Sequence, residues 1–128
     1  LMEKRRSAGV VTGNLMAGEV RGARVLVIDD MIASGGTMVR AAGALHAAGA
    51  RNVWALAAHG LFTGAAQEAL ASDALAGWIV TDTVPPFRLE GTPAAGKPEI
   101  VSAAPLLARA IGRLHEGGDV TDLPAAGS

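Results

Sequence analysis

Residues 25–37 read VLVIDDMIASGGT and join a predicted strand to the start of a predicted helix. The apolar, β-branched run Val25–Ile28 is typical of a buried parallel strand, and two carboxylates follow it at once. Ser34, two glycines and Thr37 then lead into a run of helix-forming residues. This segment therefore predicts a strand–loop–helix unit with polar side chains and glycines concentrated in its loop.

The rest of the chain continues this alternation of strands and helices. The patterns predict helices at 37–48, 65–71 and 105–116 and strands at 52–58, 78–81 and 99–102. Gly49 is expected to end the first helix, and Val10–Met16 to form an extra edge strand. The expected fold is α/β, with three layers: a mainly parallel sheet and helices on both of its faces. In such a fold the loops 29–37, 59–64 and 81–84 meet at the carboxyl ends of the strands.

Length and composition narrow the possible functions. The chain has 128 residues, enough for one domain, which we place at residues 1–116 with a tail at 117–128. Its net charge of -1 gives no global attraction to nucleic acid or to an anionic membrane, so neither is an expected partner. The chain has no cysteine, and no apolar run is long enough to span a bilayer. We therefore expect a cytoplasmic protein.

The loop after the first quoted strand has the composition of a phosphate-binding site. Glycines allow backbone N–H groups to turn toward one point, hydroxyls add donors, and the helix N-terminus adds partial positive charge. Asp29 and Asp30 do not suit a phosphate, but carboxylates accept hydrogen bonds from the vicinal hydroxyls of a sugar. The pattern therefore indicates a sugar phosphate. The alternative is that the acids simply end a strand and Ser34 caps a helix.

The same string resembles the phosphoribosyl pyrophosphate motif of type I phosphoribosyltransferases and of ribose-phosphate diphosphokinases. Four further segments are similar to the diphosphokinases: EKRR at 3–6, HGLFTGAA at 59–66, VTDTVP at 80–85 and VSAAPLLARAIGRLHEGGDV at 101–120. They occur in the same order and span nearly the whole chain. The resemblance implies a type I phosphoribosyltransferase-like fold and the carboxyl-terminal half of a diphosphokinase, which converts ATP and ribose 5-phosphate to AMP and 5-phosphoribosyl 1-pyrophosphate.

The resemblance also implies a role for each residue of the motif. Asp29 and Asp30 would face the ribose hydroxyls. The loop residues that would wrap the 5-phosphate of ribose 5-phosphate are Ala33, Ser34, Gly35, Gly36 and Thr37. The family usually has Asp where this chain has Ala33, so only the backbone contribution is expected there.

A basic triplet near the start carries the implied catalytic groups. By the resemblance, a catalytic loop at about residues 1–9 closes over the triphosphate, and Lys4 and Arg6 neutralise charge on the transferred group. Without that context the triplet reads as a solvated tail. The implied cofactor is Mg²⁺, with its ligands and the ATP site mainly outside this chain, in an N-terminal domain or a neighbouring subunit. The chain is therefore expected to belong to a homo-oligomer, to hold no dedicated metal site and to be inactive when isolated.

Two other functions stay open at this point: a small phosphoribosyltransferase and a non-catalytic phosphoribosyl-binding regulatory module. His59, at a strand end, is interpreted as structural, and Trp54 and Trp78 as core or interface residues. In the tail, Asp119 and Thr121 stand where many members have serines that line a regulatory phosphate site, and Pro124 stands where they have Phe. We therefore do not expect activation by phosphate.

Overall fold

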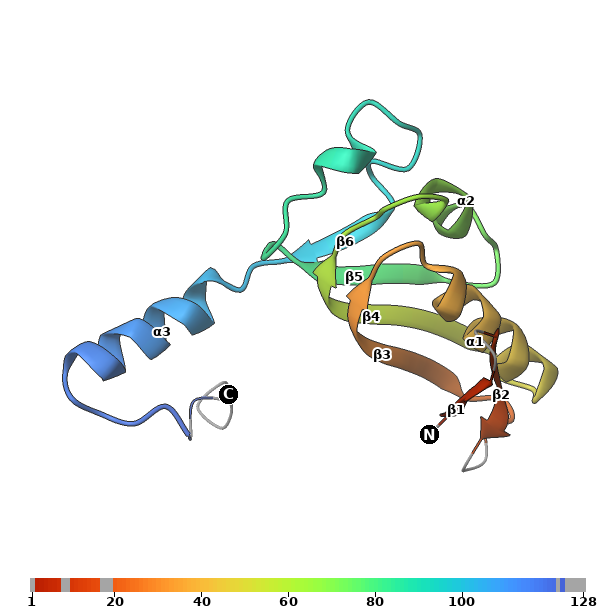
Figure 1. The fold of residues 1–128 in the computed structure, drawn as a ribbon, viewed down its shortest axis with the longest axis horizontal. Coiled ribbons are helices and arrows are strands. Elements are labelled where there is room, and N and C mark those ends of the chain that lie inside the picture. Colours follow the sequence, from red (N-terminus) through yellow and green to blue (C-terminus); the bar gives the residue numbers. More distant parts are fainter. Residues whose placement is uncertain (1, 8–9, 17–19, 122, 124–128) are drawn as a thin grey trace.

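The computed structural model describes residues 2–7, 10–16, 20–121 and 123, and its centre is a parallel sheet (Figure 1). Four strands lie side by side in chain order: β3 (Arg24–Ile32), β4 (Asn52–Gly60), β5 (Gly77–Thr81) and β6 (Pro98–Val101). The helices are α1 (Gly36–Ala47), α2 (Ala66–Leu70), α3 (Ala104–His115) and the short 3₁₀ helix η1 (Phe87–Leu89). The predicted α/β class and parallel sheet are confirmed.

Both α1 and α2 cover the same face of the sheet. Within this sheet each of β4, β5 and β6 lies beside the strand before it, and right-handed crossovers in one direction place the connecting helices on one side. Alternate strand residues pack there against the two helices; the buried set includes Met38, Ala42, Leu45, Val53, Ala55, Ala57, Ala69, Leu70, Trp78 and Val80. The described residues therefore form two layers, whereas helices on both faces and three layers were expected.

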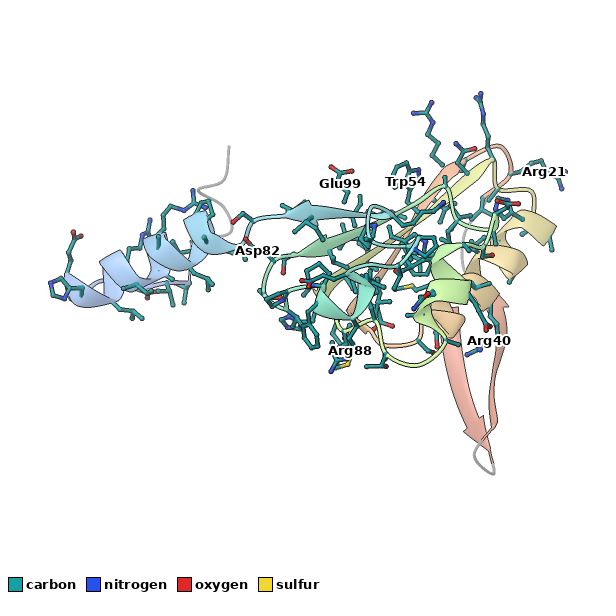
Figure 2. All side chains as sticks on the ribbon, turned by 90° about the horizontal axis from the view of Figure 1, so that it is seen from above. Arg21, Arg40, Trp54, Asp82, Arg88 and Glu99 are labelled. Atoms are coloured by element: carbon teal, nitrogen blue, oxygen red, sulfur yellow. The ribbon has the colours of Figure 1, made fainter. Side chains whose placement is uncertain are left out.

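The opposite face of the sheet is exposed and partly apolar. Ile28 is 67% exposed and Leu26 is 47% exposed. Trp54 and Glu99 project from this face, on the far side of the sheet from α1 and α2 (Figure 2). Helix α3 has no buried residue and runs away from the sheet (Figure 1). None of the helices in the described part of the chain has the length and apolar character needed to cross a membrane.

The amino-terminal strands form a sheet of their own. β1 (Met2–Ser7) pairs antiparallel with β2 (Val10–Met16), and neither joins the parallel sheet. The expected strand at 10–16 therefore has the predicted bounds, but it is not an edge of the main sheet. A strand so close in sequence to its neighbour pairs with it as a hairpin, which needs only a short connection. Most of the segment expected to be a catalytic loop is thus strand β1.

Candidate functional site

The loop between β3 and α1 depends on a close backbone approach at Gly35. This residue has φ 75°, in the left-handed region that favours glycine, and it immediately precedes α1. A Cβ on Gly35 would lie 2.8 Å from the Cβ of Ala69 and 3.1 Å from Cη2 of Trp78. No other residue fits there without moving α2 or the indole ring. The contact holds the loop against the core, and Trp78 is buried as expected.

The backbone of this loop offers hydrogen-bond donors to a ligand. The Ile32 carbonyl accepts from the N–H groups of Leu61 and Phe62 at 2.9 and 3.2 Å, and the Ala33 carbonyl accepts from Thr63 at 3.0 Å. No described residue accepts a hydrogen bond from the backbone N–H groups of residues 34–38, and no side chain caps α1. Since the first turn of a helix has no internal partners for its N–H groups, these donors are available to an anion.

The two carboxylates lie at the end of β3 rather than in the loop after it. Asp29 and Asp30 are consecutive strand residues, both exposed, and Oδ1 of Asp29 accepts a hydrogen bond from the Asp30 N–H at 2.9 Å. Both nevertheless border one cavity of about 330 Å³, whose lining is Asp29, Asp30, Met31, Ile32, Ala33, Ser34, Gly35, Thr37 and Met38. The structure thus brings together six of the seven residues expected to bind ribose 5-phosphate. Gly36, the first residue of α1, is not among the lining residues.

Lys4 and Arg6 occupy β1, outside the parallel sheet. Positions 4 and 6 of a strand lie on one side of the backbone and position 5 on the other. The pairing with β2 shifts between Glu3 and Arg5, with the extra residue on β2.

The His59 imidazole and the hydroxyls of Thr81 and Thr83 form a hydrogen-bonded cluster at the carboxyl ends of β4 and β5. Nδ1 of His59 lies 2.7 Å from Oγ1 of Thr83, and the Thr81 hydroxyl donates to the Ala58 carbonyl at 2.6 Å. The two threonine Oγ1 atoms are 2.8 Å apart. His59 lies beside Met31 of β3 in the sheet register, so the cluster adjoins the strand end that carries the carboxylates. Its hydrogen bonds fit the structural role expected for His59.

Asp82 holds the start of the last helix. Its carboxylate accepts hydrogen bonds from the Ser102 hydroxyl at 2.6 Å and from the Ala103 N–H at 2.8 Å. These two hydrogen bonds, the Ser102 bond first, lower the pKa of Asp82 from its ordinary value, because they stabilise the ionised form. Asp82 thus links the loop after β5 to the segment that leads into α3. Its carboxylate oxygens accept hydrogen bonds there and do not line the cavity at the end of β3.

Two arginines that the sequence patterns did not single out lie near the loop. Nη1 of Arg88 donates to the Leu61 carbonyl at 3.1 Å, and its guanidinium carbon lies 4.4 Å from the centre of the Phe87 ring. Nη2 of Arg40 donates to Oγ1 of Thr37 at 3.3 Å. Figure 2 shows both arginines on the helix side of the sheet, away from the exposed face. Helical spacing could have revealed Arg40, because residues three apart share one side of a helix.

The described residues contain no group of three or more His, Cys, Asp or Glu side chains placed to hold a metal ion. Two adjacent carboxylates alone leave most of the coordination of a Mg²⁺ ion to other groups. A resident Mg²⁺ site therefore does not fit the described part of this chain.

Comparison with known proteins assigns the chain to a family. A family model described as the phosphoribosyl synthetase-associated domain matches residues 11–124. The ribose-phosphate pyrophosphokinase of Haemophilus influenzae is 41% identical over 115 residues, covering 89% of this chain and 36% of that protein. The corresponding enzyme of Aquifex aeolicus is 39% identical over 108 residues, covering 84% of this chain and 33% of that protein.

A solved structure agrees with these sequence matches. The phosphoribosylpyrophosphate synthetase from Mycobacterium smegmatis superposes with a TM-score of 0.72 at 31% identity, over 91% of this chain and 37% of that one. Fold and site together define an α/β protein of the phosphoribosyltransferase-like class. Within that class, the chain belongs to the ribose-phosphate pyrophosphokinase family. It spans about a third of the length of the curated relatives that it matches.

Proposed function

We propose that this chain forms the ribose 5-phosphate-binding part of a ribose-phosphate diphosphokinase. The observation that carries the proposal is the loop at 33–37, whose free N–H donors lie in one cavity with two carboxylates. Donors suit the dianionic 5-phosphate, and carboxylates suit the ribose hydroxyls. Family membership favours this function over a phosphoribosyltransferase. The ATP site and most Mg²⁺ ligands are assigned to a part of the enzyme outside this chain or to another subunit of a homo-oligomer.

In the proposed reaction the protein positions the substrates and stabilises charge rather than forming covalent bonds to them. The anomeric hydroxyl oxygen of ribose 5-phosphate attacks the β-phosphorus of ATP, the bond from that phosphorus to the α,β-bridging oxygen breaks, AMP departs and the hydroxyl loses its proton. Loop 33–37 fixes the 5-phosphate, while Asp29 and Asp30 orient the sugar, so the anomeric oxygen is positioned before attack. Lys4 and Arg6 neutralise the charge that develops on the transferred group.

Titration with three sugars tests the binding part of this proposal. We expect ribose 5-phosphate to bind the chain, and ribose to give no measurable heat because it lacks the phosphate. 2-Deoxyribose 5-phosphate should bind about tenfold more weakly, since it loses a hydrogen bond to a carboxylate. Isothermal calorimetry at matched pH and salt gives all three values. If ribose 5-phosphate does not bind, or if ribose binds equally well, the sugar-phosphate site is wrong.

The isolated chain is expected to release no AMP from ATP and ribose 5-phosphate. Its described residues lack a metal-binding cluster, and the chain spans about a third of its relatives. The measurement is chromatographic detection of AMP with Mg²⁺ in excess, with a full-length relative as positive control. Robust AMP release would show that the chain completes the site alone and would overturn the division of labour proposed above.

A further inference from the structure

Arg40 is a positively charged residue next to loop 33–37, where the proposed function places the 5-phosphate. It lies in the second turn of α1, and its side chain folds back toward the start of the helix, where Nη2 reaches Oγ1 of Thr37. A Cβ built on Gly36 would lie 3.4 Å from Nη1 of Arg40 and 3.7 Å from Oγ of Ser34. The guanidinium therefore lies next to Gly36 and Thr37, the first two residues of α1.

Arg40 forms no ion pair with the described residues. Its one recorded hydrogen bond is to the neutral hydroxyl of Thr37, and no carboxylate in the described ranges lies within ion-pair distance. A positive side chain close to a helix N-terminus is electrostatically unfavourable, because the helix dipole is positive at that end. An anion bound at the loop would relieve this repulsion and would supply the missing partner.

The hydrogen bond to Thr37 also sets the role of that hydroxyl. A threonine hydroxyl has one proton to donate and two lone pairs that accept. Because Arg40 donates to Oγ1, it uses an accepting position and leaves the Thr37 proton for a ligand. Thr37 lines the cavity, and Arg40 is connected to it through this hydrogen bond. The pair thus presents a hydroxyl donor backed by a positive charge.

We propose that Arg40 contacts the phosphate of the bound sugar phosphate and orients the Thr37 hydroxyl toward it. This inference rests on the proposed function, because it names a further residue of the same site. The guanidinium would bind through N–H groups that Thr37 does not use, in the forked geometry that suits phosphate oxygens.

The test compares Arg40→Gln with Arg51→Gln by calorimetry with ribose 5-phosphate and with inorganic phosphate. Arg51 is an exposed arginine just before the amino end of β4, whereas the loop follows the carboxyl end of β3, at the other end of the parallel strands. We expect Arg40→Gln to weaken both ligands about tenfold and to reduce the salt dependence of binding, with Arg51→Gln unchanged. Arg40→Lys, which keeps the charge without the fork, should lose about threefold.

Each outcome distinguishes this inference from the function on which it rests. If Arg40→Gln binds both ligands as wild type does, Arg40 is only a solvated helix residue, while the sugar-phosphate site stands. If the wild-type chain binds neither ligand, both the sugar-phosphate site and the proposed role of Arg40 are wrong. Equal losses in Arg40→Gln and Arg51→Gln would indicate a general charge effect and would also overturn the contact. Thermal melting of each variant shows whether the fold is kept.

Discussion

Alanine in place of Lys4 or Arg6 is expected to lower the turnover of the complete diphosphokinase roughly a thousandfold, by analogy with other cations of phosphoryl transfer. The Michaelis constants should change much less. Cations that meet the transferred group mainly in the transition state raise turnover more than they tighten ground-state binding. Steady-state kinetics of the full-length enzyme at saturating Mg²⁺ measures both quantities.

Arg5→Ala is the matched control for this prediction. Because successive side chains alternate along a strand, a catalytic role shared by positions 4 and 6 predicts a small effect of Arg5→Ala. Near-normal turnover in the Lys4 and Arg6 variants, together with a loss in Arg5→Ala, would reverse the assignment of the two sides. If none of the three alanine variants changes turnover, the basic triplet is a solvated surface without a catalytic role.

The second large effect is expected from Gly36→Asp, which should abolish binding of ribose 5-phosphate, with a loss of at least about a hundredfold. At an effective dielectric constant of about 20, a carboxylate a few ångströms from a phosphate repels it by several kcal/mol. A Cβ on Gly36 meets no backbone or core atom within 3.4 Å, so the variant should fold. The new carboxylate would also pair with Arg40 and withdraw that cation from the ligand.

Gly36→Asn separates charge from bulk in this experiment. Asparagine has nearly the shape of aspartate and no charge, so it should retain most of the affinity. If Gly36→Asp binds as wild type does, the loop is not a phosphate cradle. If both variants lose binding equally, the site excludes a side chain at position 36 through its size.

The fold was predictable wherever local patterns decided it. The run Val25–Ile28 identified β3, and Gly49 was expected to end α1; its φ of 94° and the Ala50 N–H bond to the Leu45 carbonyl at 3.0 Å confirm that ending. The extent of β3 was not predictable from its apolar run, because the strand continues through Asp29 and Asp30 to Ile32 by backbone pairing with β4 on both sides of Asp30. Their side chains carry no information about that pairing.

The site was predictable to the extent that it is contiguous in sequence. The cavity-lining residues between Asp29 and Thr37 lie in one segment, and their types indicate their chemistry. The contact of Gly35 with Ala69 and Trp78 joins three distant segments, so no local pattern encodes it. The one-sided placement of the helices depends on the order of strands in the sheet, which alternation alone leaves undetermined.

The in-line strand order of the parallel sheet has a consequence for how the chain acquires its structure. β4 adds to the edge of β3, β5 to β4, and β6 to β5, so each pairing joins segments separated by a single crossover. Among the described strands of this sheet, none has to be inserted between two that have already paired. Pairing segments that are close in sequence costs less loop-closure entropy. The sheet can therefore grow by adding strands at one edge, in the order in which the ribosome synthesises them. The strand end that carries Asp29 and Asp30 would then be among the first parts of the sheet to form.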